Sequence, residues 1–204
     1  MNALPEFPTY NGHFVTPYLA VGAFPKPEHV PEIEAAGIRG ILNVISVAGR
    51  ECFEYVARLP KHIAWRHVGF WDGYFGPPER GAGQTLCASF ARMAVIEAAM
   101  MIRDHAPALI HCGGGSGRSG NLSAIVVAAR EGVSIDEAIA LMQQRRKVIA
   151  RFFREGFWKF NTDEELVGLA RAVFSEKETP RALYCSRIRG EPDPTIGSFE
   201  RIEA

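Results

Sequence analysis

Cysteine is scarce in this 204-residue sequence, and its four cysteines are widely scattered. A structural zinc site usually takes its ligands from cysteines at short, regular spacing, and a disulfide framework pairs several cysteines. No CxxC pair occurs here. The sequence therefore argues against both kinds of cysteine cluster, and each cysteine has to be judged by its neighbours. The four are Cys52, Cys87, Cys112 and Cys185.

The sequence also lacks net charge and long apolar runs. Lys and Arg number 23 and Asp and Glu number 23, so no overall field attracts nucleic acid or an anionic membrane. The N-terminus shows no basic stretch followed by an apolar run, and the apolar stretch at 122–129 is too short to span a bilayer. We therefore expect a soluble, cytoplasmic protein that binds neither nucleic acid nor membrane.

The composition that is present, 47% hydrophobic and 23% charged, is ordinary for one globular domain with a substantial core. We predict a single domain over residues 1–174. The remainder, 175–204, combines many charges with several prolines and is predicted to be an irregular extension.

Apolar patterns predict strands that alternate with helices. Apolar runs at 38–45, 63–70 and 108–110 are typical of buried strands. Apolar steps of three and four predict a helix over 85–105, and an apolar face predicts another around 122–129. Residues 30–36 and 151–172 are also predicted to be helical. Gly37 and Gly132 end two of these helices, and a capping box of Ser134 and Glu137 begins another. The alternation predicts an α/β fold with helices on both faces of a sheet. The predicted buried faces are Leu86, Phe90, Met93, Ile96 and Met100 on the long helix, and Ile135, Ala138, Ile139 and Met142 on the capped one.

The segment IHCGGGSGRSG lies between a predicted strand and a predicted helix. Four of the five residues between Cys112 and Arg118 are glycine. Glycine lets successive backbone N–H groups turn toward one point, and the helix that begins near Arg118 adds its positive end. The segment therefore predicts an anion-binding loop made of Gly113, Gly114, Gly115, Ser116 and Gly117.

Cys112 is the candidate nucleophile of this loop. Inward amides, the helix end and the Arg118 guanidinium surround its sulfur with positive charge, so we expect a thiolate at neutral pH. The planar fork of Arg118 matches two phosphoryl oxygens. The hydroxyl of Ser119 can donate to the sulfur, and His111 can orient the loop through hydrogen bonds. The alternative is a tight structural turn that holds an inert buried cysteine.

The motif HCGGGSGRSG resembles the His-Cys-x5-Arg-Ser/Thr signature of cysteine-dependent tyrosine and dual-specificity phosphatases. A weaker resemblance covers about residues 15–165, where YLAVGAFPKP and GIRGILNVIS look like the family's successive strand and helix elements. It implies a central mixed β-sheet flanked by helices on both faces. It also implies hydrolysis of phosphomonoesters through a cysteinyl-phosphate intermediate, without a metal or another cofactor.

The resemblance further implies a general acid on a loop before the nucleophile. In FWDGYFGPP the matching residue is Asp72, and Glu79 is the alternative acid. An aspartate before a glycine is also a common turn former, so Asp72 has a structural interpretation as well. Some family members pair the nucleophile with a second cysteine, but neither Cys52 nor Cys87 occupies a matching position. We expect both to be core cysteines.

A phosphoprotein is the expected substrate, because the loop contains no Lys, unlike the loops of members that favour highly phosphorylated inositides. No segment matches the family's phosphotyrosine-recognition loop, which implies a shallower pocket open to phosphotyrosine, phosphoserine and phosphothreonine. The alternatives are a phosphoinositide or small-molecule phosphatase, a non-catalytic module that binds phosphorylated partners, and thiol chemistry such as sulfur transfer or arsenate reduction.

A basic cluster follows the capped helix. It either receives an acidic or phosphorylated substrate near the pocket rim, or forms a solvated helix end that complements the helix dipole, and the second interpretation is favoured. The histidines outside the motif show no spacing typical of metal ligands and are interpreted as structural. The cluster consists of Arg145, Arg146, Lys147, Arg151 and Arg154.

Overall fold

The computed structural model describes residues 4–45, 50–70, 82–147 and 162–175. Its five-stranded sheet has the order β1-β2-β5-β3-β4. The edge strand β1 (Gly12–Thr16) pairs antiparallel with β2 (Leu19–Gly22). The other pairings, among β2, β5 (Ala108–His111), β3 (Gly40–Ile45) and β4 (Ala64–Phe70), are parallel. The sheet is therefore mixed, and β5 is its central strand.

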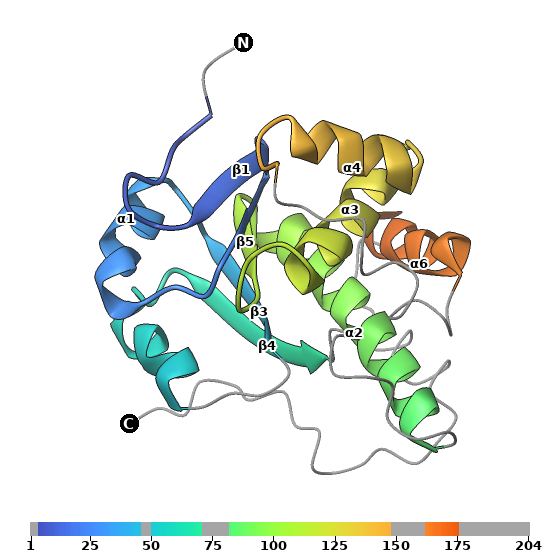
Figure 1. The fold of residues 1–204 in the computed structure, drawn as a ribbon, viewed down its shortest axis with the longest axis horizontal. Coiled ribbons are helices and arrows are strands. Elements are labelled where there is room, and N and C mark those ends of the chain that lie inside the picture. The colour runs from blue at the N-terminus through green and yellow to red at the C-terminus, as the bar shows by residue number, and fades with distance from the viewer. Residues whose placement is uncertain (1–3, 46–49, 71–81, 148–161, 176–204) are drawn as a thin grey trace.

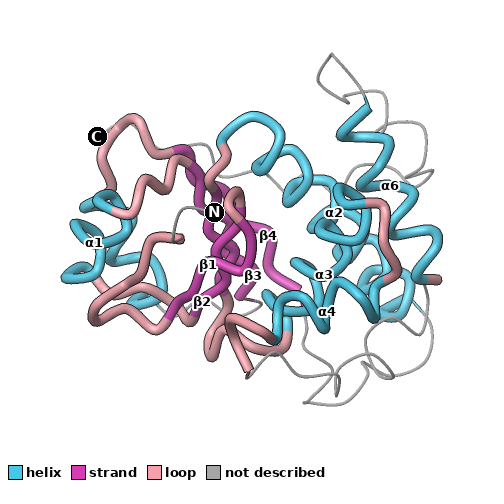
Figure 2. The backbone as a smooth tube through the Cα atoms, turned by 90° about the horizontal axis from the view of Figure 1, so that it is seen from above, coloured by secondary structure: helices cyan, strands magenta, loops and turns pink. Residues whose placement is uncertain are grey.

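Helices cover both faces of this sheet (Figure 2). On one side lie α2 (Ala82–His105), α3 (Arg118–Glu131), α4 (Ile135–Gln143) and α6 (Asp163–Ser175), as Figures 1 and 2 show. The short α1 (Val30–Ala35) lies on the other, and the 3-10 helices η1 (Pro27–His29) and η2 (Arg50–Arg58) belong to the same region. The predicted α/β architecture is confirmed. Within the described ranges, no helix is both long and apolar enough to cross a membrane.

Two separate cores form because each strand sends alternate side chains to opposite faces. Leu42 and Ile110 point into the larger core beneath α2 and α3. Their neighbours Ile41 and Leu109 point into the smaller core beneath α1 and η2. Burial on both faces explains why these strands read as continuous apolar runs in the sequence.

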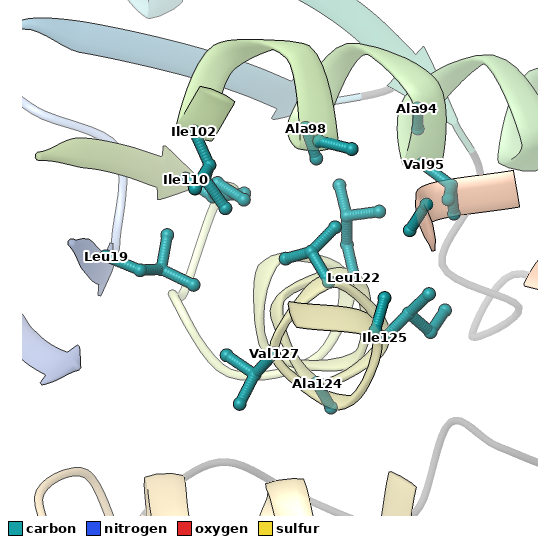
Figure 3. Packing of buried hydrophobic residues seen from close by; sticks show 14 of the residues in the cluster. Leu19, Ala94, Val95, Ala98, Ile102, Ile110, Leu122, Ala124, Ile125 and Val127 are labelled. Atoms are coloured by element: carbon teal, nitrogen blue, oxygen red, sulfur yellow. The ribbon is translucent and has the colours of Figure 1, made fainter. Parts of the chain in front are cut away.

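Helix α3 runs through the middle of the larger core. Its residues from Ser119 to Ala129 are all buried. Figure 3 shows this helix end-on, with Leu122 between it and Ala98 of α2, and with Leu19 and Ile110 of the sheet to one side. Packing on several sides fixes the axis of α3, and with it the position of the residues that precede the helix.

The predicted helix signals act where they were expected. Gly132 ends α3 in the left-handed conformation at φ 72°, and Gly37 follows α1 at φ 80°. The backbone N–H of Glu137 donates to Ser134 Oγ at 3.2 Å, while the N–H of Ser134 donates to the Glu137 carboxylate at 2.8 Å. The predicted buried face of α4 is confirmed at all four positions. Of the helix expected over 151–172, residues 151–161 lie outside the described residues, and α6 covers 163–175.

Candidate active site

The glycine-rich segment connects the central strand to the central helix. β5 ends at His111, Cys112 follows, and α3 begins at Arg118 after the loop 113–117 (Figure 1). Because β5 is parallel to both of its neighbours, this loop leaves the sheet at the carboxyl ends of its parallel strands. That edge is the usual place for a ligand site in an α/β fold.

The sulfur of Cys112 lies inside the loop. The residue is 3% exposed, and its backbone N–H donates to the carbonyl of Gly22 at 3.4 Å. The backbone N–H of Gly115 donates to the sulfur at 3.3 Å, and Ser119 Oγ lies 3.2 Å from it. The structure thus brings the predicted nucleophile together with an inward amide and with the predicted hydroxyl donor.

Gly115 can only be glycine in this backbone. Its φ is +72°, and an added Cβ would lie 2.3 Å from Ala23 N and from the carbonyl carbon of Gly22. The neighbouring Gly113 accepts a hydrogen bond from Phe24 N at 3.2 Å. The loop is therefore held against the end of β2 by contacts that leave no room for a side chain at residue 115.

The first turn of α3 faces the same loop. Its N-cap residue is Gly117, which has no side chain with which to cap the helix, and the first turn contains no acidic residue. The Gly117 carbonyl accepts from both the backbone N–H and the side-chain amide of Asn121, each at 2.9 Å. Helix N–H groups without a side-chain cap are able to bind an anion.

Arg118 lies close to the first residue of the loop. Its Nη2 is 3.8 Å from the position that a Cβ on Gly113 would occupy. The side chain is partly exposed, unlike the buried Ser119 that follows it. The guanidinium therefore lies beside the loop, with part of its surface open to solvent.

His111 is fully buried behind Cys112 and belongs to a chain of hydrogen bonds. The indole N–H of Trp65 donates to the hydroxyl of Tyr55 at 2.8 Å, and that hydroxyl lies 2.6 Å from His111 Nε2. Since the tyrosine oxygen accepts from Trp65, its own proton is available for Nε2. Burial lowers the pKa of His111 from its ordinary value of 6.5 to about 3, so the ring is neutral. The Tyr55 hydroxyl thus holds a neutral His111 in place directly before the loop, and its orienting role stays a prediction.

Arg146 corrects the interpretation of the basic cluster as a solvated helix end. The residue is only 2% exposed, whereas Arg145 and Lys147 on either side of it are exposed. Its Nε donates to the carbonyl of Gly115 at 2.8 Å. Nothing in the sequence distinguishes the buried member of this basic run from the exposed ones. Arg151 and Arg154, the other members of the cluster, lie outside the described residues.

The predicted general acid also lies outside the described residues, as does Glu79. The same is true of Cys185, while nothing is described of the side chains of Cys52 and Cys87. Sequence reasoning missed Tyr55 and Trp65 as partners of His111. Neither lies in a recognisable motif, because their contact depends on how η2 and β4 meet in space.

The fold is that of the cysteine-dependent tyrosine and dual-specificity phosphatases. The PTP-2 phosphatase of Cydia pomonella matches with a TM-score of 0.56 and 18% identity, over 73% of this chain and 89% of that one. TpbA of P. aeruginosa matches with a TM-score of 0.55 and 14% identity, over 83% and 93%. Human DUSP28 matches with a TM-score of 0.52 and 20% identity, over 84% and 99%. At these identities the likeness concerns the fold. No family model matches the sequence, and neither does any curated protein.

Proposed function

We propose that this chain is a phosphomonoester hydrolase that works through a cysteinyl-phosphate intermediate without a metal ion. The observation that carries the proposal is the placement of a buried cysteine sulfur at the start of a glycine-rich loop, in contact with Gly115 N and Ser119 Oγ. The uncapped N-terminus of α3 and the guanidinium of Arg118 lie at the same loop. This arrangement suits a tetrahedral dianion, which needs several donors that converge on one point.

In the first step, the Cys112 thiolate attacks the phosphorus atom. The S–P bond forms as the bond from phosphorus to the leaving oxygen breaks, and a carboxylic acid, which we assign to Asp72, gives its proton to that oxygen. The loop amides and Arg118 bind the three non-bridging oxygens, and their hydrogen bonds strengthen as negative charge redistributes. The loop residues Gly113, Gly114, Gly115, Ser116 and Gly117 thus take the role that a metal ion plays in other phosphatases.

In the second step, water attacks the phosphorus of the intermediate. The Asp72 carboxylate accepts a proton from this water, the S–P bond breaks, and the electron pair returns to the sulfur. The Ser119 hydroxyl can donate to the departing thiolate from 3.2 Å. Inorganic phosphate and the free enzyme are the products.

A phosphoprotein is the substrate that we rank first, with phosphotyrosine ahead of phosphoserine and phosphothreonine. The loop contains no Lys that would favour a highly phosphorylated inositide. Among the similar structures, a cysteine-to-serine variant of TpbA is described in complex with pTyr, and PTPMT1, with a TM-score of 0.50, in complex with PI(5)P. We assign catalysis to residues 1–174 and regard 175–204 as an extension.

Hydrolysis of an aryl phosphate by the wild type and by Cys112→Ser tests this function. We expect the wild type to hydrolyse the ester with or without EDTA and to be inhibited by vanadate. The serine variant should lose turnover and still bind vanadate, since the loop is unchanged. Turnover that survives in Cys112→Ser would contradict the nucleophile, and turnover that requires a divalent metal would contradict the metal-independent mechanism. A wild type that binds phosphate without hydrolysing any ester would favour the non-catalytic binding module.

A further inference from the structure

Arg146 is a buried cation without an anionic partner among the described residues. Its guanidinium is held between the loop and the edge of the sheet, and it forms none of the ion pairs found in the described part of the chain. Removing a charge from water is costly unless other groups compensate for the lost hydration. Packing alone therefore does not explain why a charged residue is buried at this position.

The hydrogen bonds of Arg146 all go to neutral acceptors. Its Nε donates to the carbonyl of Gly115 at 2.8 Å, and Nη1 donates to His13 Nδ1 at 2.8 Å. Both Nη1 and Nη2 donate to Asn11 Oδ1 at 3.2 Å. Because His13 accepts on Nδ1, its ring is neutral, and burial together with Arg146 lowers its pKa. The guanidinium is thus fixed in place by acceptors that carry no charge.

The contact with Gly115 determines how one peptide group of the loop is oriented. In a trans peptide the carbonyl of one residue points opposite to the N–H of the next. When Arg146 holds the Gly115 carbonyl on its own side, the N–H of Ser116 is directed to the other side. The preceding N–H, that of Gly115, already donates to the Cys112 sulfur. Arg146 therefore acts on the same loop as Arg118, from the side of Asn11 and His13.

The charged state of Arg146 depends on burial and on two neighbouring side chains. Burial lowers the pKa of Arg146, whereas Tyr10 and Cys112 act in the opposite direction and favour its charged form. The guanidinium and the sulfur are therefore close enough to interact through their charges, by way of the Gly115 backbone, which contacts both. A bound phosphate dianion would gain from the same charge.

We propose that Arg146 is a positioning residue of the candidate active site, which orients the Gly115–Ser116 peptide and places a positive charge beside the loop that holds Cys112 and would bind the oxyanion. The proposal rests on the proposed function and deepens it. The hydrogen bonds of Arg146 reach a loop carbonyl and not the sulfur, so it works through the loop. Its acceptors Asn11 and His13 keep the guanidinium from turning toward solvent.

Three variants separate this role from a merely structural one. Arg146→Gln removes the charge, Arg146→Lys keeps the charge but cannot reach three acceptors at once, and Arg145→Gln removes a charge from the exposed neighbour as the matched control. The readouts are the rate of Cys112 alkylation by iodoacetamide across a pH series, the affinity for vanadate, and the thermal midpoint. Alkylation requires the thiolate but no turnover.

We expect Arg146→Gln to alkylate about tenfold more slowly than the wild type near pH 6, and to approach the wild-type rate at alkaline pH. Its vanadate affinity should also fall about tenfold. Arg146→Lys keeps the charge but not the three hydrogen bonds. Its alkylation rate near pH 6 should therefore fall by a smaller factor than its vanadate affinity. Arg145→Gln should match the wild type in both.

The proposal is overturned if Arg146→Gln keeps the alkylation profile and vanadate affinity of Arg145→Gln, whatever its thermal midpoint. If Arg146→Gln fails to fold, Asn11→Ala and His13→Ala release the guanidinium without removing it, and unchanged vanadate affinity in both would overturn the positioning role. The proposed function fails differently, through a wild type that binds vanadate and is alkylated but hydrolyses no phosphate ester.

Discussion

The Ser119 hydroxyl lies 3.2 Å from the Cys112 sulfur, across the loop that separates them in the sequence. Ser119 occupies the first turn of α3, and both residues are buried. A hydroxyl at this distance is able to donate a hydrogen bond to a thiolate, and it is needed most when the sulfur leaves phosphorus with a full negative charge. The contact therefore bears on the second step of the proposed reaction more than on the first.

Ser119→Ala should lower kcat by about 10 to 100-fold, because one charge-assisted hydrogen bond to the leaving thiolate is lost. The covalent intermediate should accumulate, so that rapid mixing with an aryl phosphate gives a burst followed by slow turnover. The control is Ser123→Ala on the same helix, whose buried hydroxyl has no partner within the described residues. It should keep kcat and be at least as stable as the wild type. A Ser119→Ala variant without a burst and with unchanged kcat would contradict this role.

Gly115→Ala and Gly114→Ala should differ sharply in stability. At residue 115 the new Cβ would meet backbone atoms at 2.3 Å in a left-handed conformation, whereas at residue 114 nothing lies within 4 Å. We expect Gly115→Ala to lose about 2 to 4 kcal/mol of unfolding free energy and Gly114→Ala to lose much less. Urea titration of both variants measures the difference. Equal losses would mean that the contact between the loop and the end of β2 does not constrain Gly115.

The neutral state of His111 makes stability depend on pH. Its folded pKa of about 3 lies below the ordinary value of 6.5, so the unfolded chain binds a proton that the folded chain does not. This contribution is fully present above about pH 6.5 and is lost as the pH falls toward 3. Relative to His111→Gln, the wild type should lose up to about 1.4 kcal/mol more per pH unit in that window. The measurement is the unfolding free energy of both proteins at several pH values. If it falls equally in the wild type and in His111→Gln between neutral and acidic pH, His111 is not held neutral.

Asp72→Asn should lower the rate about 10² to 10⁴-fold for esters with poor leaving groups, because protonation of the leaving oxygen is lost. The loss should be smaller for an aryl phosphate whose leaving group is already acidic. Comparing kcat/KM over a series of aryl phosphates measures this dependence, with Glu79→Gln treated in the same way. If only Glu79→Gln shows a larger loss of kcat/KM for poor leaving groups, the general acid is Glu79.

Much of the fold follows from local signals in the sequence. The run of apolar residues into Cys112, the glycines after it and the capping box at Ser134 predicted β5, the loop, α3 and the start of α4, because each depends on residues close in the chain. By contrast, β1 and η2 were not predicted. Strand β1 is a short edge strand that forms against β2. The 3-10 helix η2 carries Tyr55, whose role depends on its contacts with Trp65 and His111.

The buried face of α2 shows a second limit of sequence reasoning. Of the large residues expected on this face, Ile96 is buried, Phe90 and Met100 are partly buried against the core, and Met93 is partly buried. Alanines fill the contact instead, among them Ala91, Ala94 and Ala98, which are fully buried. Small side chains let α2 approach the sheet and α3 closely, and hydrophobic periodicity gives them too little weight. The burial of Arg146 was missed for a related reason, since only the fold determines which member of a basic run turns inward.

The covalent intermediate tests the central claim most directly. The wild type and Ser119→Ala are mixed with an aryl phosphate, quenched in acid within the first turnover and digested, and the peptides are analysed by mass spectrometry. We predict one phosphoryl group on the peptide that contains Cys112, more of it in Ser119→Ala, and none in Cys112→Ser. Hydrolysis that proceeds with no phosphorylated cysteine in either enzyme, or with the phosphoryl group on another residue, would contradict it.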